Sequence, residues 1–282
     1  MALFFIPVDK QYISLAKKFI EPYEETCVFL SSYLRRGSKH LYFISKKDNP
    51  QKTGDLHGVI YIESSVFHCI PHADEINFLE FQRGLSPLFQ EIKIKCISGE
   101  AKGTDYIINL LKEKFGEPYQ TNHYNLMTAS AVQNPPEDLC NDDQIIRCTE
   151  NDMEELLPIQ KKYMNEEVAP FGKKASDAEV AMGLRQILKN QLCLALYSDD
   201  EIVAKANTNA IGVNWIQLGG IYTHPLYRRN GYAWQLISAI LRRTSKAGKK
   251  AALFVKDINV PAMELYKKLG FTNSGLYTIG YY

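Results

Sequence analysis

Gly219-Gly-Ile-Tyr-Thr-His-Pro-Leu-Tyr-Arg-Arg-Asn-Gly-Tyr-Ala233 runs from a predicted strand through a basic loop into a predicted helix. The apolar face of that helix carries Trp234, Ile237, Ile240 and Leu241. The first backbone N–H groups of a helix are unpaired and the dipole is positive there, so a glycine-containing loop at this place can bind a diphosphate. The stretch therefore predicts an anion site, although a basic turn that only caps the helix fits the same residues.

Three residues of the loop have separable roles in this interpretation. Gly231 would let a phosphate approach the backbone, because it has no side chain and tolerates a left-handed conformation. Ala233 would leave the first helical turn uncrowded, and Arg228 would add a fixed positive charge.

Two downstream segments follow the loop: Leu253-Phe-Val-Lys-Asp-Ile-Asn259 and Ala262-Met-Glu-Leu-Tyr-Lys-Lys-Leu-Gly-Phe271. Together with the loop they resemble the GNAT acetyltransferase superfamily, in its R-x-x-G-x-A phosphate loop after a T-x-P strand end and in its N-x-x-A-x-x-L-Y-x-x-x-G-F signature. The resemblance covers roughly residues 144–282. Residues 1–130 show no counterpart of the phosphate loop.

The resemblance implies acetyl-CoA as the acyl donor, with a pantetheine arm that pairs like a strand where two strands of the sheet splay apart. It places the arm against Ile221, Tyr222 and Thr223, and the diphosphate at Arg228, Arg229, Asn230, Gly231, Tyr232 and Ala233. It also implies that Asn259 contacts the CoA arm and that Tyr266 lies near the sulfur. Seven residues along a helix put these two side chains on one face, roughly 10 Å apart.

Acyl transfer to an amine requires deprotonation of the amine, donors for the oxyanion and an acid for the thiolate. Tyr266 is the candidate acid, and its alternative is a core residue beside Leu265 and Leu269. The oxyanion donors are expected among the backbone N–H groups near Tyr222.

The general base is harder to assign. Gln217 occupies the position where many members of the superfamily have a carboxylate, and an amide cannot accept the proton. A water chain, or Glu166 or Glu167 reaching in from the connection between two helices, could replace it, although these glutamates also fit a solvated surface pair. His224 fits a turn residue better than a base.

The element pattern predicts an α/β fold with a mixed sheet, GNAT-like in its C-terminal domain. A polar linker with a Pro-Pro pair at residues 130–143 separates an N-terminal α/β domain, 1–131, from the acetyltransferase domain, 142–282. A strand, helix, glycine, strand order at residues 93–127 parallels that at residues 251–282, where a pair of strands, 271–273 and 277–282, is expected to end the chain. The N-terminal domain is thus a candidate degenerate copy of the second domain.

The composition is that of a folded chain, with 45% hydrophobic and 23% charged residues among 282. A net charge of +1 offers no field for nucleic acid or acidic lipid, and no segment predicts a signal peptide or a membrane span. Six scattered cysteines predict reduced thiols and no metal site, which suggests the cytoplasm.

The sequence leaves the acyl acceptor open between a small-molecule amine, a polyamine, a peptide N-terminus and a lysine side chain, and it leaves the oligomeric state open. We expect CoA only in the C-terminal half, because the comparable N-terminal segment, His68 to Glu75, has two carboxylates and no glycine. A non-catalytic acyl-CoA sensor or scaffold is the main alternative function. An interaction protein without a cofactor is the second.

Overall fold

One continuous sheet joins both halves of the molecule in the computed structural model, which describes residues 3–90, 92–130, 145–168, 174–198 and 200–282. Its 12 strands have the order β1-β2-β3-β4-β5-β12-β6-β11-β10-β9-β8-β7. The predicted α/β fold with a mixed sheet is confirmed. The linker predicted at residues 130–143 lies outside the described residues, except for Ser130.

The N-terminal half contains β1 (Phe4–Pro7), α1 (Ile13–Ile20), α2 (Val28–Arg36), β2 (Leu41–Ser45), β3 (Leu56–Ile62), β4 (Ser65–Cys69), α3 (Phe78–Leu85), β5 (Cys96–Glu100), α4 (Ala101–Phe115) and β6 (Gln120–Ala129). The C-terminal half contains β7 (Ile145–Arg147), α5 (Met153–Tyr163), α6 (Asp177–Asn190), β8 (Cys193–Ser198), β9 (Glu201–Ile211), β10 (Trp215–Thr223), α7 (Tyr232–Ser245), β11 (Lys250–Val255), α8 (Val260–Lys268) and β12 (Thr272–Tyr281).

The two halves repeat one order of elements: a strand, two helices, three strands, a helix, a strand, a helix and a strand. In each half the fourth and fifth strands run parallel, β4 with β5 and β10 with β11, while the other described pairs are antiparallel. This agreement supports the duplication that the sequence predicts.

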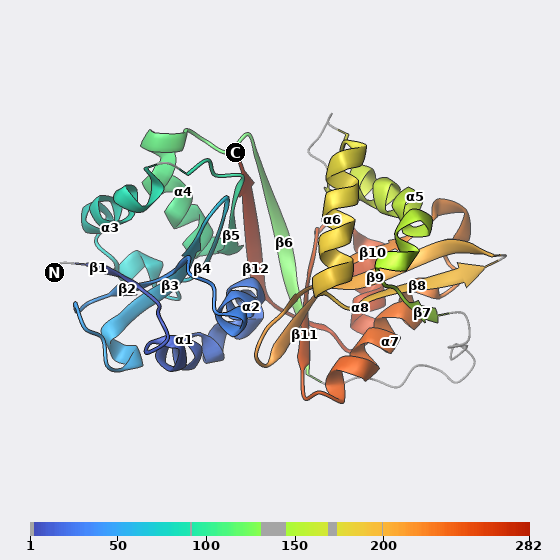
Figure 1. Cartoon of the computed structure of the whole chain (residues 1–282), viewed down its shortest axis with the longest axis horizontal. Coiled ribbons are helices and arrows are strands. Elements are labelled where there is room, and N and C mark those ends of the chain that lie inside the picture. Colours follow the sequence, from blue (N-terminus) through green and yellow to red (C-terminus); the bar gives the residue numbers. More distant parts are fainter. Residues whose placement is uncertain (1–2, 91, 131–144, 169–173, 199) are drawn as a thin grey trace.

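The last strands of the two halves are exchanged. β12 lies between β5 and β6, and β6 lies between β12 and β11, so that each half completes the other half's part of the sheet. Figure 1 shows β6 and β12 side by side between the two lobes of the molecule. Segments 1–131 and 142–282 therefore share hydrogen-bonded strands.

The end of the chain differs from the expectation in one respect. A single strand, Thr272–Tyr281, replaces the expected strand pair, and it pairs with β6 along its length. A register irregularity between Asn273 and Gly275 absorbs the polar residues that suggested a break. The Ser274 hydroxyl donates to the carbonyl oxygen of Leu126 at 3.5 Å, which bridges the irregularity.

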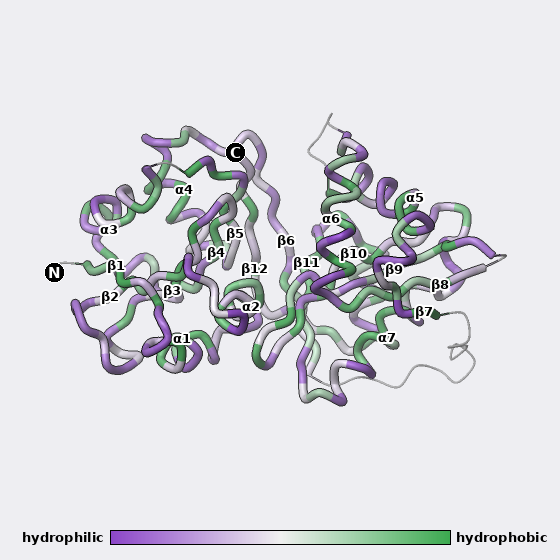
Figure 2. The backbone as a smooth tube through the Cα atoms, viewed as in Figure 1, coloured by the Kyte–Doolittle hydropathy of each residue, from purple (hydrophilic) through white to green (hydrophobic). Residues whose placement is uncertain are grey.

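Hydrophobic residues recur along the strands and helices of both halves, and hydrophilic residues gather in peripheral turns (Figure 2). The predicted apolar face of α7 is confirmed for Ile237, Ile240 and Leu241, which are buried against the sheet, while Trp234 is half-buried. The halves also meet at Glu24, a buried carboxylate that accepts hydrogen bonds from the backbone N–H groups of Val213 (2.7 Å) and Asn214 (3.0 Å).

Candidate functional site

The loop before α7 has a backbone shape suited to anions. Arg229 and Gly231 both have left-handed backbones, with φ of 71° and 77°, and Gly231 is the N-cap residue of α7 without a side-chain cap. Left-handed residues next to right-handed or extended ones direct backbone N–H groups into one concavity, which is a common anion site. A left-handed arginine is unfavourable by about 1 kcal/mol, so the surrounding structure must stabilise this conformation.

Arg228 does not face this loop in the structure. Its Nη2 lies 3.0 Å from Oε2 of Glu166, and its Nε donates to the carbonyl oxygen of Thr223 at 3.2 Å. The positive charge of Arg228, which we expected beside a phosphate, is thus paired with the carboxylate of Glu166.

The predicted splay of two strands is present beside the loop. β10 pairs with β11 only from Trp215 to Leu218, whereas its pairing with β9 extends to Thr223. The backbone edge of residues 219–223 that faces β11 therefore has no strand partner in the described part of the chain. Ile221, Tyr222 and Thr223 lie on this edge, where an extended ligand could add like a strand.

A bulge interrupts β10 between Gly219 and Tyr222, and a buried lysine stabilises it. Gly220, at φ 56°, accepts a hydrogen bond on its carbonyl oxygen from Nζ of Lys205 at 2.8 Å. Lys205 also donates to Oδ1 of Asn207 at 3.0 Å, and its Nζ lies 4.9 Å from the ring centroid of Tyr163. These three acceptors match the three N–H donors of an ammonium group.

Lys205 is fully buried, and no carboxylate of the described residues forms an ion pair with it. Burial lowers its pKa from the ordinary value, and the Cys193 and Cys148 thiols oppose that shift. Sequence reasoning missed this residue. The only signal was a lysine inside the apolar run Ile202-Val-Ala-Lys-Ala206.

Tyr266 on α8 is a core residue. It is 7% exposed, and its ring centroid lies 6.0 Å from that of Phe271. Burial, followed by the nearby Tyr163 and Glu167, raises its pKa, so the phenol keeps its proton at neutral pH. Burial likewise raises the pKa of Tyr163 to about 12.

Asn259 caps α8, with its Oδ1 accepting from the Ala262 N–H at 3.3 Å. The amide oxygen of Asn259 is therefore already used in a helix cap after β11. A ligand arm would have to compete with the Ala262 N–H for this oxygen.

Gln217 lies on β10, is 3% exposed, and sits opposite Ala210 of β9 and Ala252 of β11, two residues before the splay begins. Of the two candidate glutamates, Glu166 reaches the site from the π-helical turn Met164–Val168: its Oε1 accepts a hydrogen bond from the Tyr222 hydroxyl at 2.7 Å. Burial and this carboxylate raise the pKa of Tyr222 to about 12.

Two other candidates differ in their surroundings. The Glu167 side chain is exposed, yet it lies near enough to raise the pKa of Tyr266, and its carbonyl oxygen accepts a hydrogen bond from Nζ of Lys256 at 3.4 Å. His224 is a turn residue, as expected: its Nδ1 accepts from the Leu226 N–H, and its Nε2 contacts Lys162.

The corresponding place in the N-terminal half is filled. β4 pairs with β5 only from Ser65 to Phe67, and His68 then packs so tightly on β5 that a Cβ at Gly99 would lie 2.2 Å from its Nε2. The same Nε2 bonds Thr104 Oγ1 at 2.9 Å, and burial lowers the pKa of His68 to about 3. The side chain of Asn77 caps α3 by accepting a hydrogen bond from the Glu80 N–H at 3.1 Å, so one N–H group of the helix start already has an acceptor.

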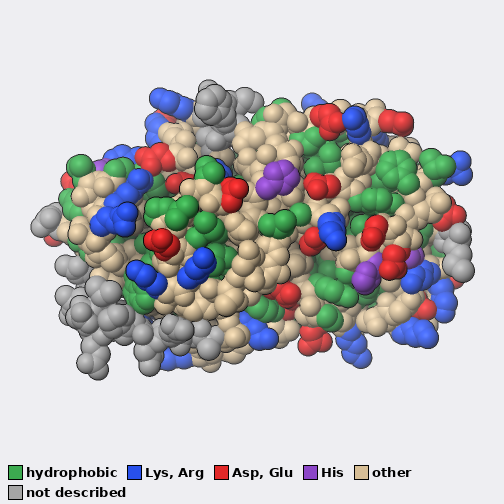
Figure 3. Space-filling model, turned by 180° about the vertical axis from the view of Figure 1, so that it is seen from behind, with side chains coloured by type: hydrophobic (Ala, Val, Ile, Leu, Met, Phe, Trp, Pro, Cys, Tyr) green, Lys and Arg blue, Asp and Glu red, His purple; other side chains and the backbone are tan. Residues whose placement is uncertain are grey.

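Acidic and basic side chains are interspersed on the face opposite to that of Figure 1, as Figure 3 shows for the described residues. No group of three metal-ligating side chains occurs among the residues described. Within the same ranges, none of the helices combines the length and apolarity that crossing a bilayer requires.

Residues 156–271 match the model of the acetyltransferase (GNAT) family. The C-terminal half therefore contains a domain of the acetyltransferase (GNAT) family. No curated protein matches the sequence.

Two solved structures share the fold over both halves. A Drosophila protein aligns over 100% of this chain and 99% of its own, with 14% identity and a TM-score of 0.67. A GCN5-related N-acetyltransferase from Sphaerobacter thermophilus aligns over 98% and 94%, with 11% identity and a TM-score of 0.57. This chain spans only 65% of the length of a putative GNAT acetyltransferase from Novosphingobium aromaticivorans. That alignment covers 58% of this chain, with 20% identity and a TM-score of 0.47.

Proposed function

We propose that the C-terminal half is an acyl-CoA-dependent N-acyltransferase that transfers acetyl from acetyl-CoA to a primary amine by direct attack in a ternary complex. The observation that carries this proposal is the left-handed loop at the start of α7 beside the splay of β10 from β11. The loop fits a diphosphate at Arg229, Asn230, Gly231, Tyr232 and Ala233, and the splay fits the extended arm.

In the proposed reaction the amine nitrogen attacks the thioester carbon, and the carbonyl oxygen becomes an oxyanion. Backbone N–H groups at the bulge of β10 would donate to that oxygen, and the ammonium of Lys205 behind the bulge would stabilise its charge in a buried environment. The attack forms the C–N bond, and collapse of this intermediate then re-forms the carbonyl and breaks the C–S bond. Tyr266 would give its proton to the departing thiolate.

The proton released by the amine needs a route to solvent. Gln217 cannot accept it and would orient water, while the Glu166 carboxylate, beside the Tyr222 hydroxyl and 42% exposed, would be the first acceptor connected to bulk water. Arg228, whose Nη2 lies 3.0 Å from Oε2 of the same carboxylate, would hold Glu166 in place beside Tyr222.

We expect Gly231→Glu to abolish CoA binding. The added side chain brings bulk and negative charge into the concavity where the diphosphate would lie, and it strains a backbone at φ 77°. Calorimetric titration with CoA measures the loss. Gly248→Glu is the matched control, since it has the same charge and a similar φ of 69° beyond the other end of α7. Equal CoA affinity in both variants would show that the loop does not form part of the CoA site.

We expect Lys205→Met to lower turnover by about 10²-fold, the lower end of the loss typical for one oxyanion donor. Because burial lowers the pKa of Lys205, the unfolded chain binds more protons than the folded chain between that pKa and the ordinary value of 10.5. The free energy of unfolding of the parent should therefore rise with pH in this window relative to the variant. Urea titrations at several alkaline pH values check this, and identical pH profiles would contradict a charged, desolvated Lys205.

A non-catalytic sensor of acyl-CoA remains the alternative function, and the absence of a carboxylate at Gln217 favours it. Incubation with acetyl-CoA and an amine panel, followed by detection of free thiol, separates the two. Saturable CoA binding without thiol release would support the sensor and contradict the acyltransferase.

A further inference from the structure

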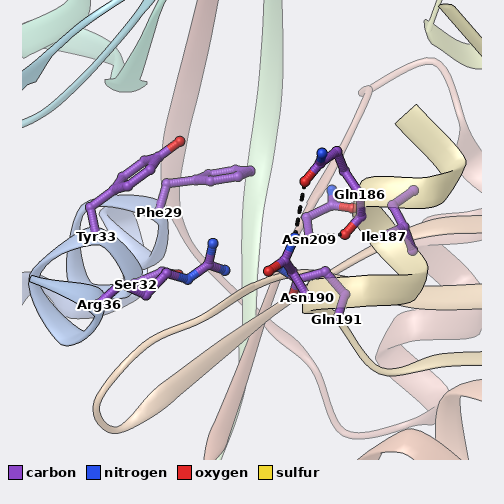
Figure 4. Close-up of a pocket in the computed structure, with 9 residues that line it drawn as sticks. All are labelled: Phe29, Ser32, Tyr33, Arg36, Gln186, Ile187, Asn190, Gln191 and Asn209. Carbon is purple, nitrogen blue, oxygen red and sulfur yellow. Dashed lines mark hydrogen bonds between the residues drawn. The ribbon is translucent and has the colours of Figure 1, made fainter. Parts of the chain in front are cut away.

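A cavity of about 290 Å³ lies between the two halves, away from the phosphate loop. One wall is α2 of the N-terminal half, with Phe29, Tyr33 and Arg36, and the other is the end of α6, with Gln186 and Asn190 (Figure 4). Asn209 of β9 also lines the cavity.

One residue of the cavity, Asn209, packs against the start of the splay. Asn209 packs so closely on Gly219 that a Cβ there would lie 2.0 Å from its Nδ2. Gly219 directly follows Leu218, the last residue of β10 that pairs with β11. A molecule in the cavity would therefore have one end where the strands diverge and a thioester would lie.

The charge of the cavity is one-sided. Among the described residues that line it, Arg36 is the only ionised one and none is a carboxylate. No described carboxylate forms an ion pair with Arg36. Figure 4 shows its guanidinium directed across the cavity toward Asn190. Arg35, one residue earlier, is instead occupied by the carbonyl oxygen of Ile211 at 3.0 Å.

Two aromatic rings form a preorganised apolar surface on the same wall. Phe29 stacks on Phe67 with ring centroids 4.7 Å apart, and Tyr33 stacks on Tyr61 at 3.9 Å. Because their partners lie on β3 and β4, these rings are held by the sheet of the N-terminal half. They offer a flat group a packing surface at little entropic cost.

We infer that this cavity binds the acyl acceptor, and that the acceptor is an amine carrying a carboxylate and an apolar group, as an aromatic amino acid does. The carboxylate would pair with Arg36, which can hold it bidentately, and the apolar group would pack on Phe29 and Tyr33. The amine would then lie at Asn209 and Gly219. Polyamines and lysine side chains fit poorly, because the cavity offers them a like charge and no carboxylate.

This inference rests on the proposed function, but its first test does not need turnover. With the protein saturated with CoA, calorimetry compares N-acetyl-L-phenylalanine with N-acetylphenethylamine, which lacks only the carboxylate. We expect at least tenfold tighter binding of the acid by the parent, and equal binding of both compounds by Arg36→Ala. Arg83→Ala, another arginine in the last turn of a helix, lines a separate cavity of the N-terminal half and should keep the parent's preference.

Three results of this titration would overturn the inference: no binding of the acid, equal affinity of the parent for both compounds, or a carboxylate preference that survives in Arg36→Ala. Retained binding of N-acetylphenethylamine by Arg36→Ala shows that the variant is folded.

Turnover separates this inference from the proposed function. Acetylation of phenethylamine and spermidine without acetylation of phenylalanine would overturn the acceptor class and leave the N-acyltransferase standing. Carboxylate-dependent binding at Arg36 without thiol release from acetyl-CoA by any acceptor would support the site and contradict the proposed function.

Discussion

Tyr266→Phe should lower turnover by about 10²–10⁴-fold while CoA affinity stays unchanged. The substitution keeps the ring, which is buried beside Phe271, and removes only the proton that we assign to the leaving thiolate. A loss of this size is typical for general acid catalysis and equals roughly 3–5 kcal/mol of activation free energy. Steady-state kinetics with acetyl-CoA, together with calorimetry with CoA, measures the two quantities separately.

Tyr277→Phe is a matched control for this variant. Tyr277 is 2% exposed on β12, burial raises its pKa as it does for Tyr266, and its hydroxyl contacts Ser98 Oγ of β5 at 2.6 Å. Its loss should affect stability rather than turnover. Gln217→Ala should reduce turnover less than Tyr266→Phe, because an amide only orients water. Turnover of Tyr266→Phe within threefold of the parent would identify Tyr266 as a packing residue.

The segment 142–282 alone should fail to fold. It lacks β6, which pairs with both β11 and β12 and inserts Leu126 and Met127 into the core with 0% and 2% exposure. Burial of two such side chains contributes about 3–6 kcal/mol, which is comparable to the 5–15 kcal/mol that stabilises a typical domain. The segment would also lose Glu24, the acceptor for the backbone N–H groups of Val213 and Asn214.

Circular dichroism and sedimentation of the isolated segment measure this effect. Co-expression with segment 1–131 as a separate chain is the control, since it returns β6 and should restore a soluble complex that binds CoA. A monomeric 142–282 with a cooperative melt and the parent's CoA affinity would contradict the role we assign to β6. That outcome would show that the GNAT domain closes its own sheet.

Local signals predicted much of the candidate site. The loop at Arg228–Ala233 could be predicted because a glycine before an amphipathic helix has few structural alternatives, and the structure places a left-handed Gly231 at that N-cap. Glu166 was one of several candidates for the proton route. Only the folded chain distinguished it from Glu167, by a hydrogen bond to Tyr222.

Other features depended on contacts between distant segments. The sequence could not show that Arg228 pairs with Glu166, because those residues are 62 positions apart. Sequence reasoning missed Lys205 because the Gly220 carbonyl that accepts its hydrogen bond is 15 positions away and is placed beside it only by β10. The cavity at Arg36 needs α2 and α6, which belong to different halves.

The sequence by itself predicted the order of elements in the C-terminal half up to the last strand, a duplication and an anion-binding loop, because periodicity, capping and glycine conformation act over a few residues. Tertiary structure decided which strands are neighbours. Side chains of β6 and of β12 alternate between the two faces of the sheet, and this pattern fits beside any neighbouring strand. The local sequence therefore does not specify that each of these strands lies within the other half. That exchange, with the packing of α2 against the C-terminal half, makes the N-terminal half a wall of the cavity where we place the acceptor.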